Sequence, residues 1–104
     1  MVVEKWLAKP GKQEEHTQIM KKFRKYLKDN PEMFKEVKSL REYTQMFGGI
    51  SGMFIWLIEY ESLADYEKLA SRMEKDEEAA KLTQEWTALI DRPTWSIEVW
   101  RATE

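Results

Sequence analysis

The sequence predicts a single α+β domain built on one antiparallel sheet, and three observations support this. The chain has 104 residues, of which 42% are apolar and 35% charged, as expected for one globular domain spanning residues 1–104. Apolar residues recur with a period of two in some segments and of three to four in others, the patterns of strands and amphipathic helices. Residues 53–58 are apolar without interruption, and such a strand is normally covered on both faces.

The first part of the chain is expected to contain a strand and a long helix. Residues 2–8 alternate in the strand pattern until Pro10 and Gly11 break it. The helix that begins at Lys12 has an apolar stripe of His16, Ile19, Met20, Phe23, Tyr26 and Leu27. Asn30 is expected to cap a further short turn through Phe34.

The two middle strands are expected to form a hairpin. Residues 37–47 are mixed in polarity, which favours a place at a sheet edge. Gly48, Gly49 and Gly52 provide the loop, and residues 53–60 form the apolar partner strand.

Two helices and a final strand are expected to complete the domain. Ser62, with Asp65 three residues later, resembles a capping box, and Asp76 is expected to cap the next helix. The apolar face of that second helix consists of Ala79, Leu82, Trp86, Leu89 and Ile90. Pro93 is expected to end it, and residues 95–101 alternate as the last strand.

The resulting order is βαββααβ, the order of a ferredoxin-like domain. Right-handed crossovers place its strands in one four-stranded antiparallel sheet with the helices on one face. The other face would expose a large apolar patch in a monomer. We therefore expect a homodimer that forms through this sheet face.

Two segments resemble a known family. VEKWLAKPGK, residues 3–12, resembles the junction of the first strand and first helix in the NIPSNAP-like branch of the dimeric α+β-barrel proteins. MFIWLIEYESLADYEKL, residues 53–69, is similar to that family's third strand and following helix. The resemblance covers nearly the whole chain and implies a dimeric α+β barrel. The resemblance does not indicate a particular reaction, because proteins with this fold catalyse several different reactions.

The resemblance also bears on cofactors. The related antibiotic-biosynthesis monooxygenases need no cofactor, whereas the haem-degrading relatives take their haem-ligand histidine from a helix after the third strand. Residues 62–90 contain no histidine, so no haem and no other cofactor is expected.

Composition argues against several other functions. The absence of cysteine excludes disulfides and thiol catalysis, and with a single histidine no metal site is expected. A net charge of −2 gives no overall attraction to nucleic acid. No apolar run approaches the roughly 20 residues of a membrane span. We expect a cytoplasmic protein with neither nucleic-acid nor membrane partners.

Aromatic residues and one histidine are the first candidates for a ligand site. Trp6, Trp56 and Trp100 are suited to stacking on an aromatic ligand, and packing in the core or the dimer interface is the alternative. His16 lies on the inner stripe of the first helix, where a base or ligand-binding role competes with a purely structural one.

Polar residues of the second strand are further candidates. Arg41, Tyr43 and Gln45 project the same way, and together they suit the orientation of a polar group on a mostly apolar ligand. Solvated residues of an edge strand are the alternative.

Two glutamates share strand parity with tryptophans, Glu4 with Trp6 and Glu98 with Trp100, which would allow all four on one sheet face. Buried there, the carboxyl groups would have raised pKa values and an acid or base role. At the barrel rim they would instead pair with nearby basic side chains.

The sequence assigns no catalytic residue. The leading interpretation is a homodimer that binds a small apolar or aromatic molecule beside the sheet. One alternative is a cofactor-independent monooxygenase, in which an electron-rich substrate activates oxygen inside a dry cavity. The other is a non-catalytic dimerisation module with a fully packed interior.

Overall fold

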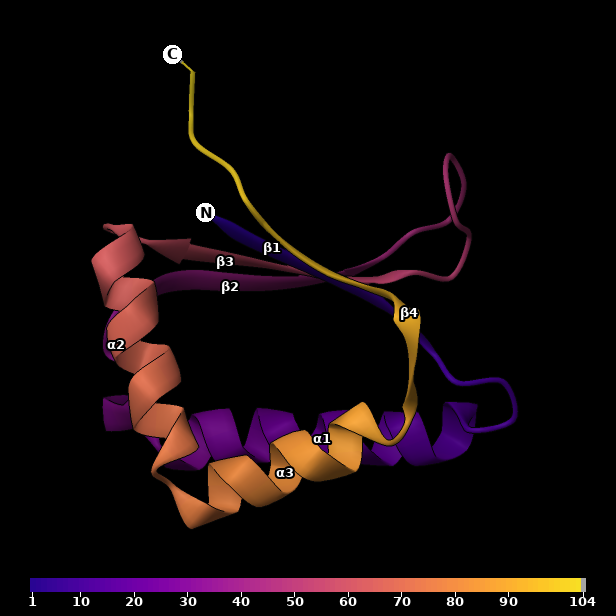
Figure 1. The fold of residues 1–104 in the computed structure, drawn as a ribbon, viewed down its shortest axis with the longest axis horizontal. Coiled ribbons are helices and arrows are strands. Elements are labelled where there is room, and N and C mark those ends of the chain that lie inside the picture. The colour runs from indigo at the N-terminus through magenta and orange to yellow at the C-terminus, as the bar shows by residue number, and fades with distance from the viewer. Residues whose placement is uncertain (104) are drawn as a thin grey trace.

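The computed structural model describes residues 1–103, and it places one antiparallel sheet over a layer of helices (Figure 1). The elements are β1 (Val2–Ala8), α1 (Gln13–Asp29), the 3-10 turn η1 (Pro31–Phe34), β2 (Val37–Thr44), β3 (Phe54–Tyr60), α2 (Leu63–Glu74), α3 (Glu77–Thr87) and β4 (Ile90–Val99). The strand order is β2-β3-β1-β4 with every pair antiparallel. The predicted ferredoxin-like α+β fold is confirmed.

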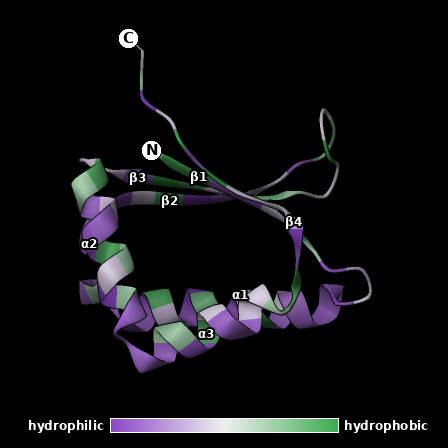
Figure 2. Cartoon of the chain, in the orientation of Figure 1, coloured by the Kyte–Doolittle hydropathy of each residue, from purple (hydrophilic) through white to green (hydrophobic). Residues whose placement is uncertain are grey.

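The helices cover one face of the sheet. In Figure 1, α1 and α3 run side by side beneath the strands, and α2 extends from the end of β3 towards α3. Figure 2 shows hydrophilic residues along the outer surfaces of α1 and α3. The apolar stripe of α1 therefore points to the sheet, and Ile19, Met20, Phe23 and Tyr26 are buried there.

The strand register divides the side chains between two faces. Glu4 of β1 lies opposite Trp56 of β3 and Ile97 of β4, and Trp56 lies opposite Glu42 of β2. Paired residues project to the same side, and Trp56 packs against Phe23 of α1, so this row lies on the helix face. The neighbouring row projects to the other side, the open face, and consists of Arg41, Leu57, Val3 and Glu98.

Aromatic rings fill the space between the sheet and the helices. Trp6 is 1% exposed and lies edge-on to Trp56 at 5.6 Å and to Trp86 of α3 at 5.1 Å between ring centroids. Trp86 in turn meets Trp95 of β4 edge-on at 5.2 Å. Such edge-to-face pairs stabilise a core beyond the area they bury, so β1, β3, β4 and α3 are held together by one connected cluster.

Side-chain caps begin the two later helices, as predicted. Ser62 Oγ accepts a hydrogen bond from the amide of Asp65, and Asp76 Oδ2 accepts one from the amide of Ala79. Asp76 Oδ2 also accepts a hydrogen bond of 2.7 Å from the hydroxyl of Tyr26, which joins the start of α3 to α1. Asn30 behaves differently from the prediction, because its side chain donates to the carbonyl of Tyr26 instead of capping η1.

The last strand begins earlier than the sequence predicts. α3 ends at Thr87, and β4 starts at Ile90, which pairs with Ala8 and is fully buried. Pro93 therefore lies within β4 and does not end the helix. It is tolerated because β4 is an edge strand with a register shift at this point, where the hydroxyl of Thr94 accepts the amide hydrogen bond of Leu7.

The hairpin between β2 and β3 has a longer loop than predicted, because β2 ends at Thr44 instead of Phe47. Gly48, Gly49 and Gly52 have φ angles of 80°, 88° and 84°, which favour glycine at all three positions. Phe47 is 88% exposed near the tip, which projects beyond the sheet in Figure 1.

The open face has an apolar centre with a polar border. Val3 is fully buried even in the single chain, and the β3 residues Ile55 and Leu57 beside it are partly buried. Arg41 and Tyr43 are exposed on the β2 side.

Among residues 1–103, no helix combines the length and the apolar character that crossing a bilayer requires.

Candidate functional site

A cleft opens between α1 and the β2 edge of the sheet. Its volume is about 240 Å³, and it is lined by Met20, Arg24, Glu42, Tyr43, Thr44, Phe54 and Trp56. Helix periodicity puts Met20 and Arg24 on the same side of α1, four residues apart. The strand register puts Glu42 opposite Trp56 and Thr44 opposite Phe54, so all four of these strand residues face the helix.

The floor of the cleft is aromatic and rigid. The ring of Phe54 stacks on Trp6 at 6.0 Å and contacts the ring of His16 at 4.5 Å between centroids. Trp56 is held edge-on by Trp6 on one side and by Phe23 on the other. Because these rings pack against one another, the floor is preformed and presents apolar surface to anything that enters.

An ion pair lies at the mouth of the cleft. Arg24 Nη2 lies 2.9 Å from Glu42 Oε2, and Arg24 Nε donates to both carboxylate oxygens at 3.3 Å. The two side chains are 52% and 31% exposed. Such a pair contributes little to stability, so a ligand with a polar end has two charged groups available to it at the entrance.

His16 lies behind the aromatic floor, where it is 1% exposed. Its Nε2 accepts a hydrogen bond of 2.8 Å from Trp6 Nε1. Burial lowers the pKa of the imidazole, and the positive charge of Arg24 lowers it further. The histidine is therefore neutral, with its accepting nitrogen already engaged.

Glu4 projects into the same interior from the other side of Trp56. Its Oε2 accepts a hydrogen bond of 2.7 Å from Trp95 Nε1. Burial raises the pKa of this carboxyl group, and the Trp95 bond offsets part of that rise. The prediction of a raised carboxyl pKa thus applies to Glu4, although its side chain is only partly buried.

Glu98 has the predicted rim environment and lies on the opposite face. Its carboxylate accepts a hydrogen bond of 3.0 Å from Trp100 Nε1 and lies 3.5 Å from Lys5 Nζ. The Trp100 bond, followed by the charge of Lys5, lowers the pKa of Glu98. The expectation that both glutamates share one face is wrong, because Glu98 pairs with Val3 and not with Glu4.

The structure brings together only some of the predicted site residues. Trp6, His16 and Trp56 converge beneath the cleft. Tyr43 reaches its rim from the edge of β2, where it is 47% exposed. Arg41 and Trp100 belong to the open face and are remote from the cleft floor.

Sequence reasoning missed the ion pair at the mouth. Arg24 and Glu42 are charged residues on a helix and on an edge strand, which is the usual pattern of solvated positions. A signal was available in the spacing, since Arg24 follows the buried Met20 by one helical turn and so lies at the border of the inner stripe. Within residues 1–103, no three His, Asp or Glu side chains converge as metal ligands.

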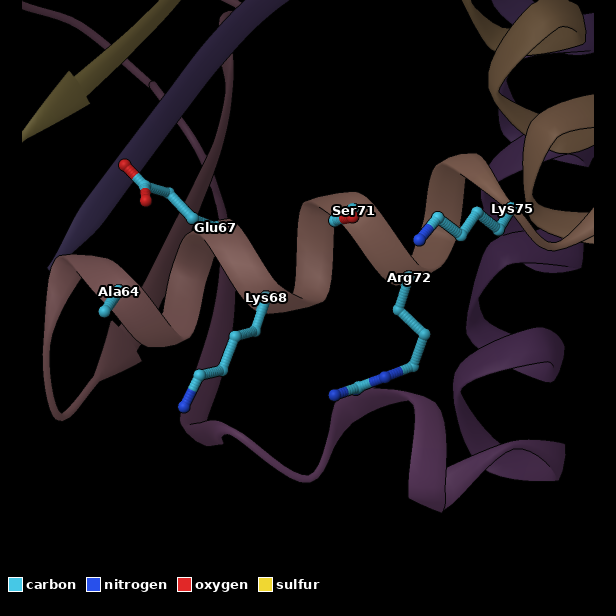
Figure 3. Close-up of a pocket in the computed structure, with 6 residues that line it drawn as sticks. All are labelled: Ala64, Glu67, Lys68, Ser71, Arg72 and Lys75. Carbon is cyan, nitrogen blue, oxygen red and sulfur yellow. The ribbon is translucent and has the colours of Figure 1, made fainter.

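A larger hollow, of about 610 Å³, lies on the outer side of α2 (Figure 3). Its lining consists of Ala64, Glu67, Lys68, Ser71, Arg72 and Lys75. This hollow is open to solvent, and the Arg72 guanidinium is already bound to Glu36 and to the carbonyl of Met33. It is more open to solvent than the α1–β2 cleft, which encloses a ligand better and is therefore the better candidate.

Several solved structures share this arrangement of helices and strands. A NIPSNAP family protein from Agrobacterium tumefaciens has a TM-score of 0.74 at 15% identity, covering 99% of this chain and 93% of the other. An uncharacterized NIPSNAP domain protein from Burkholderia xenovorans has a TM-score of 0.61 at 17% identity, with 99% and 97% covered. The chain has a NIPSNAP-like fold. A second protein from Agrobacterium tumefaciens shares it with a TM-score of 0.68 at 13% identity, with 96% and 89% covered.

The predicted NIPSNAP-like fold is thereby confirmed. No protein-family model and no curated protein matches the sequence. The likeness is therefore one of fold, and the chemistry of the cleft has to be argued from this chain's own residues.

Proposed function

We propose that this NIPSNAP-like protein is a homodimer that binds a small, mainly apolar or aromatic molecule in the α1–β2 cleft. The composition of the cleft carries the proposal: a preformed floor of Phe54, Trp56 and Met20 with a single ion pair at the mouth. The cleft sets these apolar side chains beside the polar groups of Arg24, Glu42 and Thr44, and a small-molecule site typically combines apolar surface with oriented polar groups.

The size of the cleft limits the ligand. A dry apolar cavity of about 150 Å³ holds one benzene ring, so a cleft of about 240 Å³ has room for one ring with a short substituent. A polar substituent would lie at the mouth, beside Arg24 and Glu42. We therefore expect single-ring ligands to bind more tightly than larger fused systems.

The homodimer is proposed from the open face. Val3 and Leu57 form the apolar centre of that face, and charged residues such as Arg41 and Glu98 border it. An apolar centre within a polar border is the usual anatomy of a protein interface. A second copy placed on this face would leave the cleft on the helix side accessible.

Ligand-observed NMR with a panel of phenols, benzoates and indoles tests the binding proposal. Trp56→Leu removes part of the floor and is expected to weaken binding about fivefold, since stacking on an aromatic ring contributes of the order of 1 kcal/mol. Trp100→Leu makes the same chemical change on the open face and is expected to leave binding unchanged.

Equal effects of the two substitutions would place the ligand elsewhere. A dimer that binds no member of the panel would favour the packed dimerisation module. The monooxygenase alternative is an extension of the same cleft, and it predicts oxygen consumption with electron-rich members of the panel that bind.

A further inference from the structure

Glu4 has no cationic partner among the described residues, and unlike Glu59 and Asp91, the other strand carboxylates without an ion pair, it accepts its hydrogen bond from an indole. Glu42 is paired with Arg24 at 2.9 Å, and Glu98 with Lys5 at 3.5 Å. No Lys or Arg within residues 1–103 forms an ion pair with Glu4. On the helix face, Trp56 lies between two carboxylates. The charge of Glu42 is neutralised by Arg24, and the charge of Glu4 is not neutralised by any ion pair in the described part of the chain.

Aromatic side chains surround the uncompensated carboxylate. Trp95 donates to its Oε2 at 2.7 Å, and Trp56 lies opposite it on β3. The rings of Tyr60 and Tyr66 meet edge-on at 5.5 Å, and the charge of Glu4 contributes to the raised pKa of both phenols. The negative charge therefore lies among ring systems, with two tyrosines within electrostatic reach.

The second carboxylate oxygen remains available. Among the described residues, the Trp95 indole is the side-chain donor to Glu4, and it binds Oε2 only. No buried side-chain oxygen of these residues lacks a hydrogen-bond partner, so Oε1 keeps access to solvent. The β4 residues beside it, Trp95 and Ile97, are 36% and 48% exposed, which leaves an apolar approach to this oxygen.

We propose that Glu4, Trp95 and Trp56 form a subsite for the ammonium group of a small aromatic or apolar amine. The ammonium donates to Oε1 and supplies the positive charge that this carboxylate lacks. Aromatic rings beside a carboxylate also attract an organic cation through their faces, and tryptophan does so most strongly. The apolar part of the amine lies over the exposed side chains of β4.

This subsite is distinct from the α1–β2 cleft. Trp56 separates the two, because Glu42 and Glu4 are its neighbours on opposite sides in the sheet. In the cleft, Arg24 already neutralises Glu42, so an amine gains no uncompensated charge there. The inference therefore stands whether or not the cleft binds a ligand.

The test compares 2-phenylethylamine with 2-phenylethanol, which differ in the ammonium group. Binding is measured by tryptophan fluorescence and calorimetry at neutral pH and low salt. We expect the unmodified protein to bind the amine about tenfold more tightly than the alcohol. That ratio corresponds to about 1.4 kcal/mol, which lies within the range of a cation held beside aromatic rings.

Glu4→Gln keeps the side-chain shape and an oxygen that accepts the Trp95 bond, and it is expected to abolish the preference for the amine. Glu98→Gln is the matched control on the open face and is expected to retain the preference. In a second readout, saturating amine lowers the pKa of the Glu4 carboxyl in an NMR titration, because an opposite charge favours the ionised form.

Three results would overturn the subsite. They are equal affinity for the amine and the alcohol, a preference that persists in Glu4→Gln, and no binding of the amine at millimolar concentration. If Glu4→Gln loses the preference for the amine but still binds phenols in the α1–β2 cleft, the preference is due to Glu4 and the cleft is unaffected. Loss of phenol binding with a retained amine preference would remove the proposed function and leave this subsite standing.

Discussion

In the core, Trp6 Nε1 donates a hydrogen bond of 2.8 Å to Nε2 of His16, and each of the two side chains is 1% exposed. The bond joins the central strand β1 to the first turn of α1. Because Nε2 accepts, the neutral ring carries its proton on Nδ1. Protonating this imidazole would place two donors face to face in a buried position, so the pair specifies an uncharged histidine.

The first prediction concerns the pH dependence of stability. The pKa of His16 is lowered in the folded protein, chiefly by burial, whereas the imidazole of the unfolded chain has a pKa of about 6.5. Between the folded pKa and about 6.5 the unfolded state binds more protons, so stability rises with pH in this window and is lost as pH falls. Urea unfolding between about pH 7 and pH 5 measures the slope.

Glu4 titrates with the opposite sign, since a raised carboxyl pKa gives stability that is lost as pH rises. The comparison is therefore made in a Glu4→Gln background, with and without His16→Gln. We expect the His16 slope to vanish with the histidine. His16 is the only histidine, so its imidazole pKa can also be followed directly by NMR. A value at or above about 6.5 would contradict the prediction.

Much of this fold follows from local patterns. The period-two strand around Trp6, the inner stripe of α1, and the caps Ser62 and Asp76 are each decided by neighbouring residues, and each is confirmed. The start of β4 was not predictable in this way. Ile90 reads as one more residue on the helix stripe, and only its pairing with Ala8 identifies it as strand.

The candidate site depended more on tertiary structure. His16 lies on the inner helix stripe that the periodicity predicted, whereas the strand register was needed to place Trp6 and Trp56 on the helix face. The sheet faces on which Glu4 and Glu98 lie depend on the register between β1 and β4. An alternation of apolar and polar residues does not determine that register. A shift of one residue in register would exchange a partly buried carboxyl on the helix face for one at the rim of the open face.

The second prediction concerns acid unfolding and the link between α2 and the segment that precedes β2. Arg72 Nη1 donates to the carbonyl of Met33 at 2.7 Å and to Glu36 at 2.8 Å, and the guanidinium holds the pKa of Glu36 at about 2. A depressed carboxyl pKa gives stability that is complete above the ordinary value of 4.5 and is lost as pH falls towards 2. Arg72→Gln is therefore expected to unfold at a higher pH than the parent protein.

Circular dichroism during acid titration measures this shift. Lys38→Gln serves as the control, because it removes an ion pair with Glu61 whose side chains are 52% and 72% exposed. Pairs as exposed as this contribute little. An acid midpoint that moves equally in the two variants would show that general charge balance, and not the Arg72–Glu36 pair, determines acid stability.

The third prediction tests the homodimer. Leu57 lies between Val3 and Arg41 in the central row of the open face, so Leu57→Glu places a carboxylate where the proposed interface is apolar. Burying an unpaired charge costs several kcal/mol. Native mass spectrometry is expected to give twice the chain mass of 12.5 kDa for the parent protein and a monomer for the variant.

Leu63→Glu makes the same substitution at the first residue of α2, which is 54% exposed and lies outside the rows of the open face. It is expected to remain dimeric. A parent protein that is monomeric at micromolar concentration would remove the homodimer from the proposal, and a dimer that persists in Leu57→Glu would move the interface to another surface. The α1–β2 cleft lies on the helix face, so in either case its ligand binding can be measured independently.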